Sequence, residues 1–214
     1  MNWRAVSLTN GGYPVPADPD IPAWIKPALW SPEVYPGVTI LVEAPADFHV
    51  RTIPERFLHG ASPMEQQSGI LVVVISPDDG AHHLQIQGWA ASARPAALIP
   101  LDGAEEIRIA ELRRFLKRLT GASVPGLPRS LSLRPYHVWR MADVICAYAG
   151  RVAGASQREI GRVLDPSVRA MNARQWDTSS QRARVGRLLK RAARLADRRE
   201  YVTLLRPGRF RLRA

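Results

Sequence analysis

The side chains best suited to chemistry in this sequence are arginines that recur at regular spacing near the C-terminal end. They are Arg184, Arg187, Arg191 and Arg194. At 3.6 residues per turn, that spacing places them along one side of a helix. The planar guanidinium group binds phosphate, or the O6 and N7 atoms of guanine, through two parallel hydrogen bonds. The row therefore predicts a surface for a polyanion, and for double-stranded DNA in the first place.

The helix that carries this row is expected to run from about Ser179 to Ala196, with Thr178 and Gln181 as its capping box. Its apolar stripe, which lies about 120° around the helix from the arginines, comprises Val185, Leu188, Leu189, Ala192 and Leu195. One face can thus pack on the domain while the other meets DNA. The predicted DNA contacts here, with the first three nearest the bases, are Ser180, Gln181, Arg182, Arg184, Arg187, Lys190, Arg191 and Arg194.

Two further helices are expected to position this one. Pro135 is suited to the first turn of a helix that ends near Arg151. Its predicted buried stripe comprises Val138, Ala142, Ile145, Cys146 and Ala149. After a turn at Gly154, a capping box of Ser156 and Glu159 opens a short helix, Gln157–Leu164. This order is typical of the entry to a helix-turn-helix unit.

The segments around the arginine helix complete the expected DNA-binding domain. Residues 165–177 are predicted to be irregular, with Trp176 as a packing anchor. Beyond the helix, Tyr201–Leu205 and Arg209–Arg213 flank a Pro-Gly turn and predict a β-hairpin. The hairpin resembles the wing of a winged helix, in which Arg209 and Arg211 contact phosphate.

The charge distribution separates this basic part from the rest of the chain. Residues 1–102 carry 5 Lys and Arg against 10 Asp and Glu, a net charge of −5. Residues 103–214 carry 25 against 9, a net charge of +16. A basic half joined to an acidic half indicates two tasks, of which only the basic half suits a polyanion.

The acidic half is expected to hold a small sheet and a helix. Strands are predicted at Val38–Val42, Ile70–Ile75, His82–Trp89 and Ala97–Leu101, the middle two forming a hairpin through the Asp78-Asp79-Gly80 turn. In the following helix, Asp102 and Glu105 are the expected cap and the apolar stripe comprises Leu112, Phe115, Leu116 and Leu119. Arg113, Arg114, Lys117 and Arg118 lie toward its end, where they complement the helix dipole.

The predicted fold class is therefore α+β, with a small N-terminal sheet and helix followed by a helix-turn-helix-type domain with a β-hairpin wing. A Gly, Pro and Ser-rich stretch marks the boundary. We expect an N-terminal domain at 1–120 for oligomerisation or partner contact, a linker at 121–134 and a DNA-binding domain at 135–214.

Several other classes of protein are disfavoured by what the sequence contains. The longest apolar run is six residues, far short of the roughly 20 of a membrane span. The single Cys146 excludes an internal disulfide and fits a cytoplasmic location. The five histidines have no metal-ligand spacing and are expected to be surface or capping residues, and no nucleotide-binding or hydrolase motif is present. We therefore predict no enzyme activity, no metal and no cofactor.

Several stretches together resemble the bacterial family of the transcriptional activator RovC and its DNA-binding domain. They are Leu29–Glu33, Val38–Val42, Ala44–Phe48, Ala153–Ile160, Trp176, Arg182–Leu195 and Tyr201. The resemblance implies a sequence-specific DNA-binding transcription factor. It also implies that some relatives regulate integrative conjugative elements, or bind other regulators as antiactivators. Two features depart from the usual pattern: about 14 residues separate the second helix from the arginine helix, and Gly186 stands inside the latter.

The sequence thus leads to one main hypothesis and two alternatives. The first is a cytoplasmic transcriptional regulator, an activator by resemblance, which binds double-stranded DNA as a homo-oligomer and contacts RNA polymerase or another regulator. The second is an antiactivator that uses the same helices to bind a regulator protein instead of DNA. The third, an enzyme acting on nucleic acid, needs a carboxylate or histidine cluster that the sequence does not supply.

Overall fold

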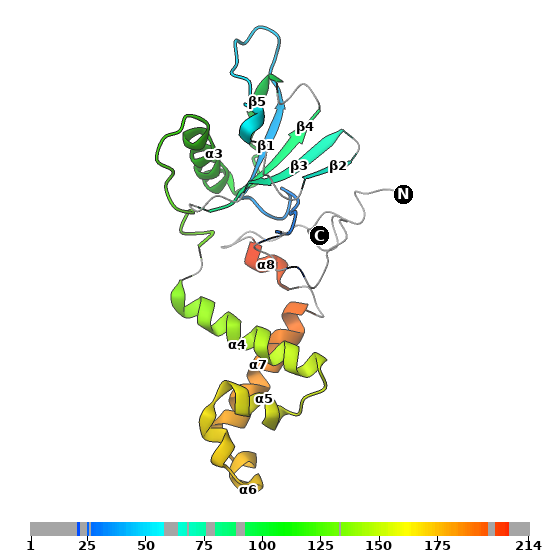
Figure 1. Ribbon diagram of the computed structural model, residues 1–214, viewed down its shortest axis with the longest axis vertical. Helices are drawn as coiled ribbons and strands as arrows, with labels where there is room; N and C mark the ends of the chain where they lie inside the picture. The colour runs from blue at the N-terminus through cyan, green and yellow to red at the C-terminus, as the bar shows by residue number, and fades with distance from the viewer. Residues whose placement is uncertain are drawn as a thin grey trace. The chain divides into compact units, whose positions relative to one another are not determined.

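The structure is a computed structural model of the chain. It describes residues 21, 25, 27–57, 64–67, 69–75, 80–88, 93–132, 134–196 and 200–205. Contacts along the backbone divide the chain into two compact units, of which the second is Leu133–Leu204 and the first contains the sheet. Strands come first and helices follow, so the predicted α+β class is confirmed (Figure 1).

The first unit is built on a five-stranded sheet with strand order β2-β3-β4-β1-β5. The strands are β1 (Val38–Glu43), β2 (Met64–Gln67), β3 (Ile70–Ile75), β4 (His82–Gln87) and β5 (Pro95–Leu98), with a 3₁₀ helix at Glu55–Phe57. β1 and β4 are parallel, and the other neighbours are antiparallel. The predicted pairing of the middle two strands is confirmed, because Ile75 lies opposite His82. Asp78 and Asp79 of their turn lie outside the described residues.

Strand β3 is covered on both of its faces, which explains its unbroken apolar sequence. Val73 packs with Leu84 and with Phe115 of helix α3 (Glu105–Leu119). Its neighbours Val72 and Val74 point to the other face and pack with Leu29. The N-terminal segment and α3 therefore cover opposite faces of the same sheet.

Helix α3 confirms part of its predicted stripe and corrects the rest. Phe115 is buried, and Leu112 and Leu119 pack against the same cluster. Leu116 is 49 % exposed, so it does not belong to the buried face. The N-cap is Ala104 rather than Asp102, whose carboxylate instead accepts hydrogen bonds from the Ala104 N–H and the Arg108 guanidinium.

Three charged side chains of α3 are buried: Arg108, Glu111 and Arg114. Arg108 donates to the carboxylate of Asp102 at 2.6 Å and to the carbonyl of Pro32 at 2.8 Å. Arg114 donates to the carboxylate of Glu111 at 2.7 Å and to the carbonyl of Pro125 at 2.8 Å. These two buried arginines hold the segments before and after the helix against it, through the carbonyls of Pro32 and Pro125.

Two adjacent histidines on β4 are core residues rather than the surface residues expected. His82 packs against Phe115 with 6.3 Å between ring centroids, and His83 packs edge-on against Tyr35 at 5.2 Å. Burial, with a smaller contribution from His82, lowers the pKa of His83 to about 4. Burial, with Glu111 nearby, raises the pKa of Tyr35 to about 12. Both groups are therefore neutral at physiological pH.

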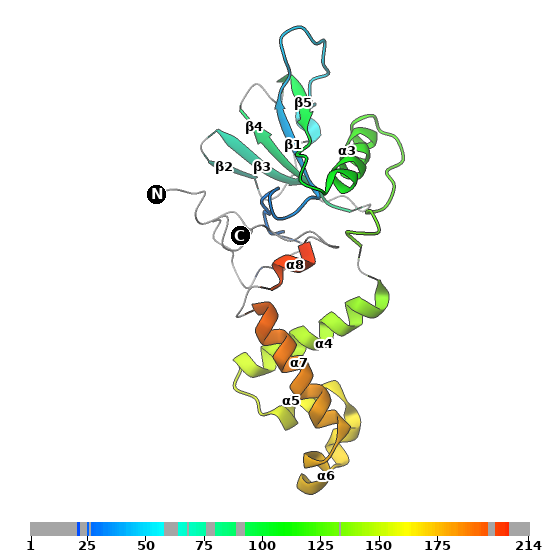
Figure 2. The same ribbon diagram turned by 180° about the vertical axis from the view of Figure 1, so that it is seen from behind.

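The second unit consists of helices that pack around one apolar cluster. They are α4 (Pro135–Val152), α5 (Gln157–Leu164), the 3₁₀ helix η2 (Pro166–Ala170), α6 (Ala173–Asp177), α7 (Ser180–Ala196) and α8 (Val202–Leu205). The cluster joins Ala147 of α4, Ile160 of α5, Val168 of η2, Trp176 of α6 and Val185 of α7. Both ribbon views show α7 crossing α4, with α5 beside them (Figure 2). Among the described residues, no helix combines the length and apolar character that crossing a bilayer requires.

Helix α4 buries a different face from the one predicted. Val144 and Ala147 are its buried residues, whereas Val138 and Ile145 of the predicted stripe are 50 % and 61 % exposed. Ala142 and Ala149 are exposed as well. The helix is apolar on two sides, so the periodicity alone does not tell which side meets the core.

The predicted wing is also corrected in its first half. Tyr201–Leu205 was expected to be a strand, but Val202–Leu205 is the helical turn α8. The carbonyls of Glu200 and Tyr201 accept hydrogen bonds from the N–H groups of Thr203 and Leu204. These local bonds satisfy the backbone without a partner strand. The second half, with Arg209 and Arg211, lies outside the described residues.

Candidate nucleic-acid interface

Helix α7 has the two-sided character that the sequence predicts. Val185 and Ala192 are buried, and Leu188 and Leu189 pack against the apolar cluster of the second unit. Its start differs by one residue, because the Ser179 hydroxyl, and not that of Thr178, accepts a hydrogen bond from the Arg182 N–H at 3.1 Å. The apolar face fixes the rotation of α7, and the arginine side remains on the surface.

Close contacts at two glycines set how the supporting helices pack. A Cβ at Gly150 of α4 would lie 2.8 Å from the Ile160 side chain of α5. A Cβ at Gly161 of α5 would lie 2.7 Å from the Trp176 ring of α6. Real Cβ atoms do not approach so closely, so these helices pack at a distance that only glycine allows. The predicted capping box of Ser156 and Glu159 opens α5 as expected.

The stretch between α5 and α7, predicted to be irregular, forms two short helices, η2 and α6. The Asp165 carboxylate accepts from the Ser167 N–H and caps η2. Asn172 and Gln175 form a capping box that starts α6. Both caps have recognisable sequence patterns. Asp165 is followed by Pro166, and Asn172 stands three residues before Gln175. They bring Trp176 into the cluster as the predicted anchor.

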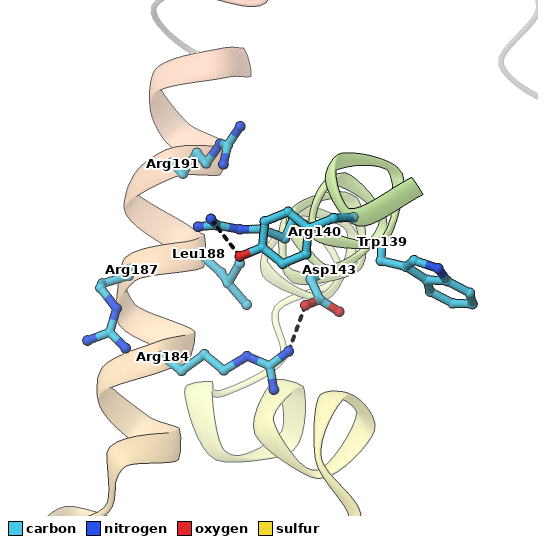
Figure 3. A pocket seen from close by; sticks show the side chains of 8 residues that line it. Trp139, Arg140, Asp143, Arg184, Arg187, Leu188 and Arg191 are labelled. Atoms are coloured by element: carbon cyan, nitrogen blue, oxygen red, sulfur yellow. Dashed lines mark hydrogen bonds and ion pairs between the residues drawn. The ribbon is translucent and has the colours of Figure 1, made fainter. Parts of the chain in front are cut away.

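The arginine side of α7 faces the first two turns of α4 across an open groove of about 400 Å³ (Figure 3). Its lining residues from α4 are Tyr136, Trp139, Arg140 and Asp143, and those from α7 are Arg184, Arg187, Leu188 and Arg191. Arg140 is a basic residue that was not among the DNA contacts predicted from the sequence. No local pattern could have found it, because only the crossing of α4 over α7 brings it to the row.

A second hollow of about 630 Å³ shares residues with the first. It is lined by Arg140, Arg187 and Arg191 together with Lys190, Arg194, Leu195, Glu200, Thr203 and Leu204. The two hollows are contiguous, since they share three arginines. We call them together the arginine groove. Its positive side chains come from α4 and α7, and most of its length follows α7.

The predicted DNA-contacting side chains differ in whether an acidic group already neutralises them. Arg184 binds the Asp143 carboxylate at 2.6 Å, Arg182 binds Asp177 at 3.1 Å, and Arg194 lies 3.7 Å from Glu200. In the described part of the chain, no carboxylate pairs with Arg187, Lys190 or Arg191. Because these three cations have no counterion among the described residues, their charge is the most available to an incoming anion.

The polar residues at the start of α7 lie where the sequence placed them, beside the arginine row. Ser180 is exposed and donates to the Gln181 side chain at 3.1 Å. Gln181 is half-buried, and its amide reaches the Ser167 hydroxyl of η2 at 3.5 Å. Their hydrogen-bonding groups are thus held in place by short local contacts.

Two carboxylates near the interface, Asp165 and Glu159, take part in helix caps. The pKa of Asp165 is lowered by hydrogen bonds from Ser167, and the pKa of Glu159 is lowered by hydrogen bonds from Ser156. Both groups therefore stay ionised at neutral pH and do not act as proton donors. Within the described ranges, no three His, Cys, Asp or Glu residues gather as a metal site. The chemistry that this surface offers is charge-assisted hydrogen bonding to an anion.

Comparison with known proteins identifies the family. Neither a curated protein nor a solved structure matches the chain. Residues 98–206 match the family RovC_DNA-bd, described as a T6SS transcription factor DNA-binding domain. The match begins at the last residue of β5 and runs through α3 and the whole arginine groove. Because it covers half of the chain, this protein belongs to the RovC family of transcription-factor DNA-binding domains.

Proposed function

We propose that this protein is a sequence-specific transcriptional regulator that acts in the cytoplasm and binds double-stranded DNA through the arginine groove. The observation that carries the proposal is the set of uncompensated cations, Arg187, Lys190 and Arg191, on a helix whose other face is fixed by the core. An exposed row of this kind suits the phosphates that flank a groove of DNA.

In this proposal α5 and α7 act as a helix-turn-helix-type pair, with η2 and α6 as an enlarged turn. Helix α7 enters the major groove, where Ser180, Gln181 and Arg182 at its start lie nearest the base edges. Arg184 and Arg194 join the phosphate contacts once an incoming phosphate competes with their carboxylate partners. Arg209 and Arg211 contribute further phosphate contacts.

The regulator is proposed to activate transcription, as its resemblance to the RovC activator implies, and to need no cofactor. The acidic part of the chain, residues 1–102, does not suit DNA, because its net charge of −5 is opposite to the +16 of residues 103–214. It is therefore the part proposed to contact RNA polymerase or another regulator.

A second candidate function, binding of another regulator as an antiactivator, is favoured by the aromatic residues at the groove. Trp139 is 74 % exposed and Tyr136 is 64 % exposed, and both line the groove beside arginines. Exposed Trp, Tyr and Arg side chains are the residues that dominate the energetics of protein interfaces. DNA recognition through the major groove has less use for exposed Trp and Tyr side chains.

The proposal is tested by fluorescence anisotropy with duplexes from upstream of the protein's own gene, over a salt series. We expect tight binding to one duplex over its scrambled version, with a steep salt dependence. Arg187→Ala and Arg191→Ala should each weaken binding and reduce the salt slope by about one. Arg113→Ala, an exposed position on α3, removes the same charge and should change neither quantity.

Weak and equal binding to every duplex, unaffected by Arg187→Ala, would contradict the proposal. The antiactivator function then predicts capture of a regulator protein that survives nuclease treatment and is lost in Trp139→Ala.

A further inference from the structure

Two aromatic side chains at the edge of the arginine groove keep most of their surface in solvent. Trp139 and Tyr136 line the groove from α4, three residues apart, and Trp139 is the more exposed of the two at 74 %. Figure 3 shows the Trp139 side chain projecting from α4 away from α7. Among the residues that the structure describes, no other ring and no cation packs on the Trp139 indole. Its ring faces are therefore open to a planar ligand.

Tyr136 is joined directly to one of the cations of the groove. The guanidinium carbon of Arg140 lies over the Tyr136 ring, 5.4 Å from its centre, and Arg140 donates to the Tyr136 hydroxyl at 3.2 Å. A guanidinium group over a ring is attracted to the negative face of its π-system. These contacts fix the Tyr136 ring beside Arg140, so an aromatic surface and a positive charge are held side by side.

The cations of α7 continue this arrangement along the groove. Arg187 and Arg191 lie four residues apart, which is about 6 Å along the helix axis. Both line the same hollow as the two aromatic rings. Cations at a regular spacing suit an anion whose charges also repeat, as the phosphates of a nucleic-acid backbone do. The stretch from Arg184 to Arg194 contains no aromatic residue, so it is the crossing of α4 that brings rings and cations together.

A positive groove edged by open aromatic rings is the arrangement by which proteins bind single-stranded nucleic acid. In a duplex the faces of the bases are stacked on one another, so a side chain reaches a base face only after that base is unstacked. In a single strand the base faces are free to stack on Trp or Tyr, and the cations hold the backbone. An acidic peptide would satisfy the cations without supplying a regular series of flat partners for the rings.

We propose that the arginine groove also binds single-stranded nucleic acid. One base stacks on Trp139, and a second stacks on the side of the Tyr136 ring that Arg140 leaves open. The phosphates of the same strand lie on Arg140, Arg187 and Arg191. Binding should depend little on sequence, because every base has a face that can stack. This activity goes beyond the duplex recognition proposed above, and a strand and a duplex should compete because both use Arg187 and Arg191.

The test is fluorescence anisotropy of the full chain with two labelled strands of about 12 nucleotides. One strand is oligothymidylate, and the other has the same length and the same phosphates but an abasic site in place of every base. The difference between their affinities measures the contribution of the bases. We expect wild type to bind the thymidylate strand roughly tenfold more tightly. Trp139→Ala should remove most of this preference, whereas Arg187→Ala should weaken the binding of both strands by a similar factor.

Two further variants serve as controls. Trp139→Phe keeps a flat ring at the same position and should restore most of the preference for the thymidylate strand. Phe48→Ala removes an aromatic side chain of the first unit that is 63 % exposed, and it should bind both strands as wild type does. Unchanged circular dichroism shows that Trp139→Ala still folds, as expected for an exposed position.

Equal affinity of wild type for the two strands overturns the proposal, because charge alone would then account for the binding. A Trp139→Ala variant that keeps the full preference overturns it as well, because the bases would then be bound elsewhere. If that variant keeps the preference but no longer captures a regulator protein, the aromatic rings belong to a protein interface instead.

An oligouridylate strand of the same length distinguishes the two sources of a single strand. Similar affinities support a groove that accepts both DNA and RNA, and a preference of roughly tenfold or more assigns the groove to the preferred one. Neither measurement requires a duplex. If every duplex binds weakly and equally, the proposed function fails, while the preference for bases and its loss in Trp139→Ala are still measured on the single strands.

Discussion

Arginines on α3 and on α7 have the same chemistry and opposite surroundings. The Arg114 side chain is 2 % exposed and ends on the Glu111 carboxylate and a backbone carbonyl. The Arg184 side chain is 44 % exposed, and its neighbours Arg187 and Arg191 pair with no carboxylate in the part of the chain that the structure describes. Net charge counts both sets alike. The comparison teaches that the burial of an arginine, and not the net charge of its segment, decides whether its charge is available to a binding surface.

The largest effect should follow from removing a buried arginine. Arg114→Ala leaves the Glu111 carboxylate buried and unpaired and should lower the free energy of unfolding of the first unit by about 3–5 kcal/mol. Urea denaturation followed by circular dichroism measures the loss. Arg113→Ala, an exposed neighbour, should stay within about 0.5 kcal/mol of wild type. Equal small losses in both variants would contradict the structural role of Arg114.

The same variant should change the pH dependence of stability. Burial raises the pKa of Glu111, and the charge and hydrogen bond of Arg114 oppose this rise. Without Arg114 the pKa rises further, so the folded chain binds a proton at a pH where the unfolded chain does not. Stability then increases as pH falls through the raised pKa. The deficit against wild type should shrink between neutral pH and the ordinary glutamate pKa, and a constant deficit would argue against this origin.

The second unit should lose stability through a substitution that leaves every arginine in place. Gly161→Ala places a methyl group 2.7 Å from the Trp176 ring and should cost about 1–3 kcal/mol of stability. Trp176 fluorescence is the closest probe of the packing that is lost. DNA affinity should fall only to the extent that the unit unfolds. An affinity loss in a fully folded variant would instead place Gly161 at the DNA.

A smaller effect should sharpen the distinction between paired and unpaired arginines on α7 itself. Asp143→Asn keeps the shape of the side chain and removes the charge that neutralises Arg184. We expect DNA affinity to rise roughly threefold, the size of an exposed ion pair. The salt slope should steepen by about one. If anisotropy shows neither change, Arg184 does not take part in binding.

The smallest effect is expected at a position with free space around it. No atom lies within 4 Å of a Cβ placed at Gly186 on α7, so Gly186→Ala should stabilise the unit by up to about 1 kcal/mol. Thermal unfolding measures the gain. Lower DNA affinity in this more stable variant would indicate that the helix backbone approaches DNA at Gly186.

Features set by local spacing were predicted from the sequence. The capping box at Ser156, the pairing of β3 with β4 and the apolar face of α7 depend on residues close to one another in the chain. The hydrogen bonds from Arg108 to the Pro32 carbonyl and from Arg114 to the Pro125 carbonyl could not be predicted. Proline carbonyls carry no sequence signal for such a contact.

The candidate site shows the same limit. The row on α7 was predicted from its spacing, but its α4 side, Arg140 and Asp143, depends on how two helices cross. The buried face of α4 was predicted wrongly, because Val144 and Ala147 are buried, whereas Val138 and Ile145 of the predicted stripe are exposed. Packing against α5 at Gly150 decides the face, and periodicity does not.

The hydrogen bond from Arg114 to the Pro125 carbonyl also shortens the stretch of chain that links the two units. The Leu127 side chain lies against Gly80 of the first unit, so this unit holds the chain at least as far as Leu127, and seven residues separate Leu127 from Pro135 at the start of α4. Seven residues span at most about 25 Å when fully extended. If the proposed function holds, a protein bound by the first unit is confined near the DNA-bound helices at an effective concentration on the order of millimolar. For a regulator that works in this way, the short linker lets weak contacts with a partner suffice to recruit that partner to the DNA.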